Sequence, residues 1–312
     1  MENLEIIKYT NDQKSNWDNF INNSKNGIFL FNRDYMEYHS DKFMDNSLMF
    51  FDGNKLLAVM PANISDNRLY SHAGLTFGGI ITNHNMKASK MLKIFDKLKE
   101  YSKAEGIKKI IYKTLPYVYH KIPAEEDLYG LFINNAVLVK KDFSSVINLN
   151  EKIYFTKDRN VRRGIESGIK IIENRDYRAF WPMIENILKN KYDTDPTHTV
   201  NQIEFLAGKF PQNIRLFGAY KDNEMIAGVV VYESNANVIH MQYQAKNNEG
   251  HRLNALDCIY HYLLNDYYKD RKFLDFGSSI RPETGLLNEG LIEYKESIGS
   301  RLIANDTYEM EC

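Results

Sequence analysis

The stretch 240–279 constrains this chain most, because its pattern predicts a strand, a glycine-bearing loop, a helix and a second strand in succession. Polar and apolar residues alternate over 240–244, and apolar residues then recur at helical spacing over 256–267. The composition of 273–277 predicts a short buried strand. We therefore expect an α/β unit built around this stretch.

The loop of this stretch places Gly250, His251 and Arg252 where we expect the helix to begin. The helix dipole disfavours cations at a helix N-terminus, whereas the dipole and the free backbone N–H groups both favour a bound anion. This placement predicts a phosphate-binding loop. The alternative is that Gly250 only turns the chain and Arg252 only faces water, because a single glycine is a weak signal.

The length of 312 residues exceeds what one typical hydrophobic core accommodates and predicts two domains. Each half shows a hairpin, a strand, a loop, a helix and a strand in the same order. This order favours a duplicated unit, with coincidence as the alternative because the residue identities match poorly. We expect lobes at 1–148 and 149–312, with hairpins at 48–61 and 214–232.

Composition excludes several classes of protein. The net charge of −1 provides no field that recruits nucleic acid or acidic membranes, and no apolar stretch reaches the ~18 residues of a membrane span. Two cysteines, Cys258 and Cys312, predict no disulfide framework and a reducing, cytoplasmic compartment, and no signal peptide is visible. The histidines are scattered singly, so no metal site is expected.

The strand, loop and helix over 240–255 resemble the GNAT acyltransferase fold, in which acyl-CoA lies along a central strand and its pyrophosphate on the loop and helix start that follow. The family's Arg/Gln-x-x-Gly-x-Gly/Ala pattern is kept in part, because Gly250 is present and Asn247 replaces its first residue. The resemblance implies that the following residues contact coenzyme A: Gln242, Tyr243, Gln244, Gly250, His251, Arg252, Leu253, Asn254 and Ala255.

Further stretches together resemble the FemAB-like, double-GNAT branch of this superfamily. They are Ser-His-Ala-Gly-Leu-Thr-Phe-Gly-Gly at 71–79, Ala-Glu-Glu-Asp-Leu-Tyr at 124–129, Pro-Thr-His-Thr at 196–199, Asp-Phe-Gly-Ser-Ser at 275–279 and the segment 287–299. The resemblance implies two tandem GNAT-like lobes, each a mixed, mostly antiparallel sheet flanked by helices. It also implies transfer of an acyl group to a primary amine, either from aminoacyl-tRNA to peptidoglycan precursors or from acyl-CoA to nucleotide-linked amino sugars.

Two features favour acyl-CoA and a nucleotide-linked amino sugar of surface polysaccharide biosynthesis. No heptad-like helical arm is inserted, and 40 basic against 41 acidic residues offer no general footprint for a phosphate backbone. The alternatives are a transferase that uses aminoacyl-tRNA, and a non-catalytic module that binds coenzyme A or a nucleotide sugar.

Three residues are candidates for the chemistry. His198 stands in a polar loop, where an imidazole with a near-neutral pKa accepts the ammonium proton of the acceptor, or only bonds within the loop. The resemblance implies that Lys295 stabilises the oxyanion, together with backbone N–H groups near 242–244. Asp275 is expected to orient the amine or a sugar hydroxyl, or only to cap the backbone N–H groups after its strand.

The acceptor residues are predicted in both halves. Glycines at 74–79 let backbone approach a ligand closely, or only form a turn, and the aromatic loop at 117–120 stacks on a base or only packs. The predicted acceptor residues are His72, Gly74, Thr76, Phe77, Gly78, Tyr117, His120, Glu126, Ser278 and Asn288.

Overall fold

The structure, a computed structural model, describes residues 4–281 and 284–312. The chain forms two compact units: unit 1 comprises Met1–Asp142 and Ala304–Cys312, and unit 2 comprises Phe143–Ile303. Strands β8 (Val137–Asn148) and β14 (Arg301–Glu311) each contribute residues to both units. The predicted lobes assigned the last residues of the chain to the second lobe, whereas 304–312 belong to unit 1.

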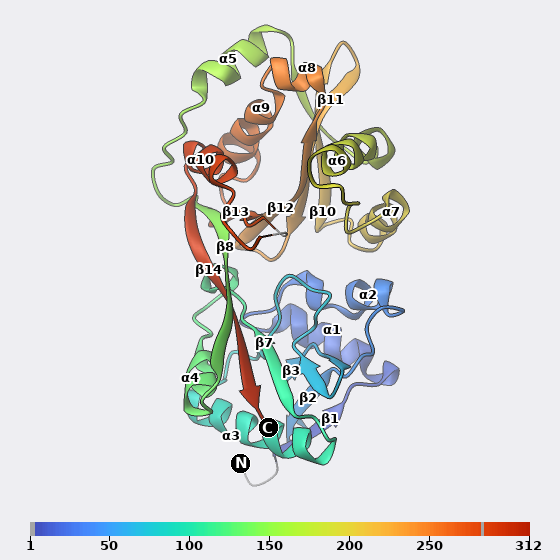
Figure 1. Ribbon diagram of the computed structural model, residues 1–312, viewed down its shortest axis with the longest axis vertical. Coiled ribbons are helices and arrows are strands. Elements are labelled where there is room, and N and C mark those ends of the chain that lie inside the picture. The colour runs from blue at the N-terminus through green and yellow to red at the C-terminus, as the bar shows by residue number, and fades with distance from the viewer. Residues whose placement is uncertain (1–3, 282–283) are drawn as a thin grey trace. The chain divides into compact units, whose positions relative to one another are not determined.

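Unit 1 contains two groups of strands (Figure 1). The first group is antiparallel and consists of β1 (Leu4–Lys8), β2 (Leu48–Asp52), β3 (Lys55–Met60) and β6 (Ile81–Thr82). The second group consists of β4 (Asn63–Ser65), β5 (Arg68–Tyr70), β7 (Lys109–Lys113) and β14. Strands β5 and β7 are parallel, whereas β14 pairs with β7 antiparallel, so the unit is a mixed α/β structure.

The longer helices of unit 1 form from amphipathic segments. They are α1 (Lys14–Asn23), α2 (Arg33–Met36), α3 (Ala88–Ala104) and α4 (Glu126–Ile133), with 3₁₀ turns η1 (Asn11–Gln13), η2 (Phe29–Phe31), η3 (Glu37–His39) and η4 (Tyr117–Tyr119). Helix α3 buries Met91, Ile94, Phe95 and Leu98, a spacing of three and four residues that places them on one face. This face packs in the same core as β2, β3 and β7.

Unit 2 is built on one run of strands in the order β8, β13 (Phe273–Ser278), β12 (Val238–Lys246), β11 (Glu224–Glu233), β10 (Ile214–Lys221) and β9 (Lys170–Asn174). The predicted hairpin is β10–β11, and its turn at Asp222 and Asn223 has positive φ values of 49° and 68°. Strands β12 and β13 are parallel, so the chain between them crosses over through a helix, and all other pairs are antiparallel.

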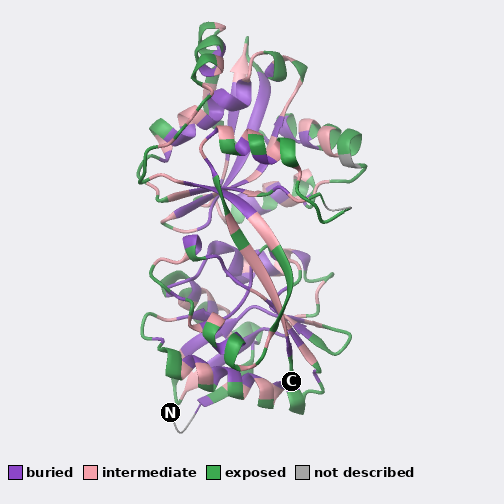
Figure 2. Cartoon of the chain, turned by 60° about the vertical axis from the view of Figure 1, so that its left-hand side comes forward, coloured by how far each residue is buried: buried purple, intermediate pink, exposed green. Residues whose placement is uncertain are grey.

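The helices of unit 2 cover this sheet. They are α5 (Asp158–Glu166), α6 (Tyr177–Tyr192), α7 (Val200–Lys209), α8 (Asn248–Arg252), α9 (Ala255–Tyr262) with a π-helical turn η5 (Leu263–Tyr267), and α10 (Glu289–Ser297). Helix α9 is buried along most of its length and shares a core with β10, β11 and β13. In Figure 2 the buried residues concentrate in the strands and on the inner faces of the helices.

Candidate functional site

The central strand of unit 2, β12, contains a β-bulge. Val230 of β11 pairs with Tyr243, and the next residue of β11, Val231, pairs with Met241, so Gln242 is the extra residue of the bulge. A bulge interrupts the ladder and re-aims the local backbone and side chains. In the described ladders, Gln242 therefore has no strand partner, although it lies in the middle of the sheet.

The neighbouring strand also leaves β12 at this point. The parallel ladder between β12 and β13 joins only Val238–His240 to Phe273–Asp275, although β12 continues to Lys246. On one side of β12, next to the bulge, lies a cavity of about 360 Å³. Its lining consists of Ile184, Ile187, Leu188, Thr194, Asp195, Thr197, Gln242, Tyr243 and Gln244. Three of the predicted donor-binding residues, Gln242–Gln244, therefore meet at one cavity.

The loop before α7 contacts the wall of this cavity through His198. Its side chain is buried, and its Nδ1 lies 2.6 Å from Oη of Tyr243, which also accepts the His198 backbone N–H at 3.3 Å. The Tyr243 ring packs edge-on against Trp181 of α6. Burial raises the pKa of Tyr243 to about 12, so the hydroxyl stays protonated at neutral pH. The Tyr243 partner was not foreseen, because no spacing in the sequence links residue 198 to 243.

Asp275 is fully buried in the middle of β13, and both of its carboxylate oxygens have partners. Oδ1 accepts the Gly277 N–H at 2.6 Å, which is the backbone-capping alternative expected from the sequence. Oδ2 lies 3.2 Å from Nδ1 of His240, which is its partner in the register of the β12–β13 ladder. The sequence reasoning missed His240, because only the pairing of two distant strands brings it to Asp275.

Lys295 on α10 is buried, and its ammonium group donates to three backbone carbonyls. Nζ lies 3.0 Å from Phe276 O, 3.0 Å from Gly277 O and 2.9 Å from Ser278 O. Burial lowers its pKa to about 8, although the nearby Asp275 carboxylate opposes this shift. An ammonium has three donors. In this structure all three hold the end of β13, so the oxyanion role of Lys295 stays a prediction that requires one of these bonds to open.

The predicted phosphate loop has a different geometry from the expected one. Helix α8 ends at Arg252, and a second helix, α9, begins at Ala255 after Asn254, whose φ is 55°. His251 and Arg252 therefore lie in the last turn of α8, where the dipole favours cations. The premise that these cations stand at a disfavoured helix start is wrong, because the sequence pattern did not separate the two helices.

The glycine of this loop is explained by packing. A Cβ on Gly250 would lie 2.1 Å from the backbone oxygen of Ile226, and the Gly250 N–H donates to Oδ1 of Asn247 at 2.8 Å. Arg252 is exposed, and its guanidinium lies 3.1 Å from Glu249. Contact of residues 250–255 with a pyrophosphate therefore stays a prediction without a supporting contact.

Two predicted acceptor residues of unit 2 stabilise local turns. Oγ of Ser278 accepts the Ile280 N–H at 3.2 Å, and Oδ1 of Asn288 accepts the Leu291 N–H at 3.3 Å as the N-cap of α10. Gly290 lies inside the first turn of α10.

In unit 1, the predicted glycine loop is a closely packed segment. A Cβ on Gly78 would lie 1.9 Å from Ser71 O, and one on Gly74 would lie 2.4 Å from Nε2 of His39. His72 and Phe77 are buried, whereas Thr76 is exposed. Burial lowers the pKa of His72 to about 3, so its imidazole is neutral.

The remaining predicted acceptor residues of unit 1 lie in η4, in the segment after it and at the start of α4. Nζ of the buried Lys25 lies 2.5 Å from Oε1 of Glu126, and Nε2 of His120 lies 3.0 Å from Leu115 O. Tyr117 is 57% exposed. Sequence reasoning missed Lys25, which is 101 residues away from Glu126 in sequence.

Among residues 4–281 and 284–312, no group of three or more His, Cys, Asp and Glu side chains is arranged to hold a metal ion. Nor does this part of the chain contain a helix that is long and apolar enough to cross a membrane.

Solved structures share this architecture over nearly the whole chain. FemX has a TM-score of 0.71 at 11% identity, and the match covers 99% of this chain and 97% of FemX. L-PGS from Bacillus licheniformis has a TM-score of 0.57 at 11% identity, covering 89% of this chain and 90% of its own. A tandem GNAT protein from the clavulanic acid biosynthesis pathway has a TM-score of 0.51 at 9% identity, covering 99% and 98%.

The chain therefore has a FemAB-like double-GNAT fold, as the sequence resemblance implied. No family model matches the sequence, and no curated protein matches it significantly. The similar solved structures establish the fold class, whereas the identity of the acyl donor and acceptor depends on the residues of the site.

Proposed function

We propose that this protein is an N-acyltransferase that moves an acyl group from acyl-CoA to the amine of a nucleotide-linked amino sugar in surface polysaccharide biosynthesis. One observation supports it most: β12 is bulged at Gln242 beside a cavity of about 360 Å³, in the second unit of a tandem GNAT fold. A bulge in a central strand frees backbone hydrogen-bonding groups that a regular ladder occupies.

In the proposed reaction, the sugar amine attacks the thioester carbonyl, a C–N bond forms, and the C–S bond breaks. The oxyanion of the tetrahedral intermediate is stabilised by backbone N–H groups near Gln242, which act best when they are preorganised. His198 is the proposed acceptor of the ammonium proton, and the released thiolate takes up a proton. Lys295 and Asp275 hold the end of β13 beside this centre in the proposed arrangement.

The test is an assay of the purified protein with acetyl-CoA and a panel of nucleotide-linked amino sugars, in which release of the coenzyme A thiol is measured. We expect release that depends on the amino sugar, and a His198→Asn variant whose kcat is restored in part as pH rises and free amine becomes abundant. Binding of both ligands without turnover by the unmodified protein would instead support a non-catalytic binding module.

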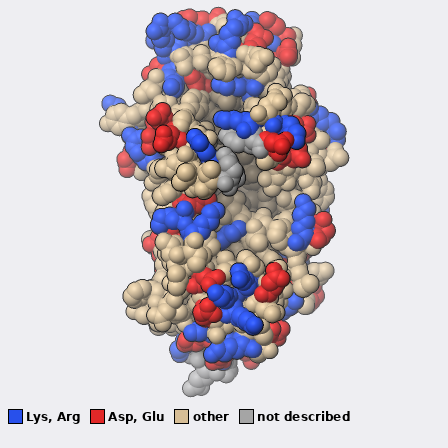
Figure 3. Space-filling view, in the orientation of Figure 1, with Lys and Arg blue, Asp and Glu red and all other residues tan. Residues whose placement is uncertain are grey.

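A second candidate is an aminoacyl-tRNA donor, and the surface of α5 favours it. Arg159, Arg162 and Arg163 are exposed on this helix, while Val161 and Gly164 are buried against α9. Within the described part of the chain, these three arginines have no ion pair within 4.0 Å. Figure 3 shows basic side chains gathered over α5 at the top of the view. Unpaired arginines on one face suit a phosphate backbone.

Charge reversal on α5 distinguishes the donors. If aminoacyl-tRNA is the donor, the double variant Arg162→Glu, Arg163→Glu should weaken tRNA binding more than tenfold and make its salt dependence shallower by roughly two charges. The control Lys93→Glu, Lys103→Glu makes the same charge change on exposed positions of α3. Ribonuclease-resistant activity with an unchanged KM for acyl-CoA in the α5 variant would exclude the tRNA candidate.

A further inference from the structure

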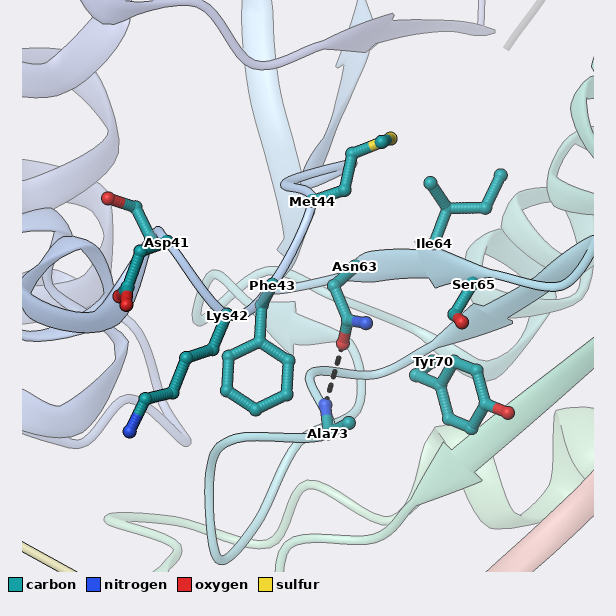
Figure 4. Close-up of a pocket in the computed structure, with 10 residues that line it drawn as sticks. Asp41, Lys42, Phe43, Met44, Asn63, Ile64, Ser65, Tyr70 and Ala73 are labelled. Carbon is teal, nitrogen blue, oxygen red and sulfur yellow. Dashed lines mark hydrogen bonds between the residues drawn. The ribbon is translucent and has the colours of Figure 1, made fainter.

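Unit 1 contains a larger pocket that the sequence reasoning did not foresee. Its volume is about 740 Å³, within the range of roughly 300–1,000 Å³ that small-molecule sites occupy. The lining residues come from the segment after η3 and from β4, β5 and the loop that follows (Figure 4): Ser40, Asp41, Lys42, Phe43, Met44, Asn63, Ile64, Ser65, Tyr70 and Ala73.

The amide of Asn63 is the polar centre of this pocket. The residue is 97% buried, and its Oδ1 accepts the Ala73 N–H at 2.7 Å, which decides the orientation of the amide. Its Nδ2 makes no hydrogen bond to another described residue and is not enclosed by protein. In Figure 4 this nitrogen lies on the side of Tyr70. Asn63 therefore presents a hydrogen-bond donor to the pocket.

Ser65 supplies the complementary group. Its Oγ donates to the Asp66 carboxylate at 3.2 Å, so toward the pocket the hydroxyl oxygen acts as an acceptor. Asn63 offers a donor and Ser65 an acceptor, and they stand two residues apart on the same strand and so on the same face. A planar ring whose edge carries both an acceptor and a donor can bond to both groups. Every nucleobase has such an edge.

Two aromatic rings flank the Asn63 amide. In Figure 4, Phe43 lies on one side of Asn63 and Tyr70 on the other. Both are partly exposed, so ring surface is available for stacking on a planar ligand. The charged lining residues, Asp41 and Lys42, have opposite signs. The pocket therefore suits an uncharged planar ring better than a phosphate group.

Hydrogen bonds hold the loop that follows β5 and supplies Ala73 to the pocket lining. Nζ of Lys113 donates to the backbone oxygens of His72, Ala73 and Leu75, at 3.4, 3.1 and 2.6 Å. His72 has a left-handed backbone, with φ of 64°, that these bonds maintain. A site that is held before the ligand arrives loses less entropy on binding.

We propose that this pocket binds the nucleobase of the nucleotide-linked acceptor, with Asn63 and Ser65 bonding the edge of the base and Phe43 or Tyr70 stacking on its face. This inference rests on the proposed function for the identity of the ligand. It assigns nucleotide recognition to residues 43–70, not to the predicted aromatic loop at 117–120.

Calorimetry without any acyl donor tests the proposal directly. The probes are the diphosphates of uridine, thymidine, cytidine, guanosine and adenosine, with inorganic pyrophosphate and ribose 5-phosphate as controls that lack a base. We expect at least one nucleoside diphosphate to bind more than tenfold tighter than both controls. The pattern across the five probes identifies the base.

Variants link that affinity to the pocket. Asn63→Asp keeps the acceptor for the Ala73 N–H and replaces the donor by an acceptor, so nucleotide affinity should fall at least tenfold. Tyr70→Ala should weaken binding severalfold, Tyr70→Phe should not, and Tyr129→Ala is the control at an exposed tyrosine of α4. If Asn63→Asp does not fold, the Tyr70 series decides the outcome.

Two results would overturn the proposal: binding of pyrophosphate as tight as that of the nucleotides, or nucleotide affinity that is unchanged in both Asn63→Asp and Tyr70→Ala. Because no donor is present, the result is separate from that of the proposed function. Nucleotide binding through this pocket without acyl transfer would leave the inference standing and the proposed function refuted. Acyl transfer by variants whose KM for the acceptor is unchanged would refute the inference and leave the proposed function standing.

Discussion

At the scale of single residues, the half-buried Lys113 and the buried Lys295 perform the same structural task in the two units. Lys113 donates to three carbonyls of the loop after β5, and Lys295 donates to three carbonyls at the end of β13. Burial lowers the pKa of each to about 8. Each ammonium satisfies backbone oxygens of its loop or strand end. For the buried Lys295, leaving such a buried oxygen without a donor costs about 1–3 kcal/mol per group.

Replacing Lys295 by Met should therefore lower the free energy of unfolding by about 2–4 kcal/mol, because buried carbonyls lose charged donors. Lys93→Met on the exposed face of α3 is the matched control and should have little effect. Urea unfolding followed by circular dichroism measures both. An unchanged unfolding free energy together with a kcat about a hundredfold lower would instead support the oxyanion role of Lys295.

The pH dependence of the same variant gives a second readout. The Lys295 pKa is about 8 in the folded state against an ordinary value of 10.5, so the unfolded chain binds more protons between these values. The contribution of Lys295 to the free energy of unfolding should therefore rise as pH increases from about 8 to 10.5, and it should stay constant below about pH 8. The difference between the native protein and Lys295→Met should show this slope. A difference that is flat over the same range would refute the shift.

At the scale of elements, Gly250 allows the short helix α8 to pack closely against strand β11. Gly250 of α8 lies against β11, and the backbone oxygen of Ile226 leaves no room for a side chain at this position. The neighbouring N-cap Asn247 accepts the Gly250 N–H, so α8 is held by its own cap and by packing. The glycine that the sequence reasoning associated with a ligand is thus required by the approach of helix to strand.

Gly250→Ala should destabilise unit 2 by roughly 1–3 kcal/mol, because overpacking displaces α8 or β11. Gly208→Ala on α7 is the matched control, since nothing lies within 4 Å of its added Cβ. There, alanine should be neutral or stabilise by up to about 1 kcal/mol through helix propensity. Thermal unfolding of both variants measures the contrast, and equal melting temperatures would show that α8 yields without cost.

At the scale of the whole molecule, the chain returns at its end to complete unit 1. Residues of β14 pair with β7 from Thr307 with Lys113 to Glu311 with Lys109, and Met310 is fully buried in the unit 1 core. The last strand therefore contributes to a unit that is otherwise formed by the first 142 residues. The stability of unit 1 depends on both ends of the chain.

Deleting residues 304–312 should therefore destabilise unit 1 selectively. The deletion leaves an edge of β7 unpaired and removes a buried methionine side chain, whose loss alone costs about 2–5 kcal/mol. Limited proteolysis with mass spectrometry should find early cuts within 4–142 and late cuts within 143–303. Equal resistance of both regions would show that β14 is dispensable.

The sequence alone was sufficient for the elements whose pattern is local. Local patterns predicted the hairpins at 48–61 and 214–232, and both are observed, as β2–β3 and β10–β11, because a two-residue turn depends on neighbouring residues. The combination of motifs also indicated the double-GNAT fold. Strand β14 was not predicted, since its partly exposed residues lack a clear apolar alternation.

Only the tertiary structure decided the sites. Gln242–Gln244 were predicted as a group because they are consecutive, but the bulge depends on the register with β11. The pairs of His240 with Asp275 and His198 with Tyr243 join segments 35 and 45 residues apart. The pocket around Asn63 is formed by three segments that the chain brings together. Hydrophobic periodicity reports which face of an element is buried, whereas the partner across that face is determined by packing.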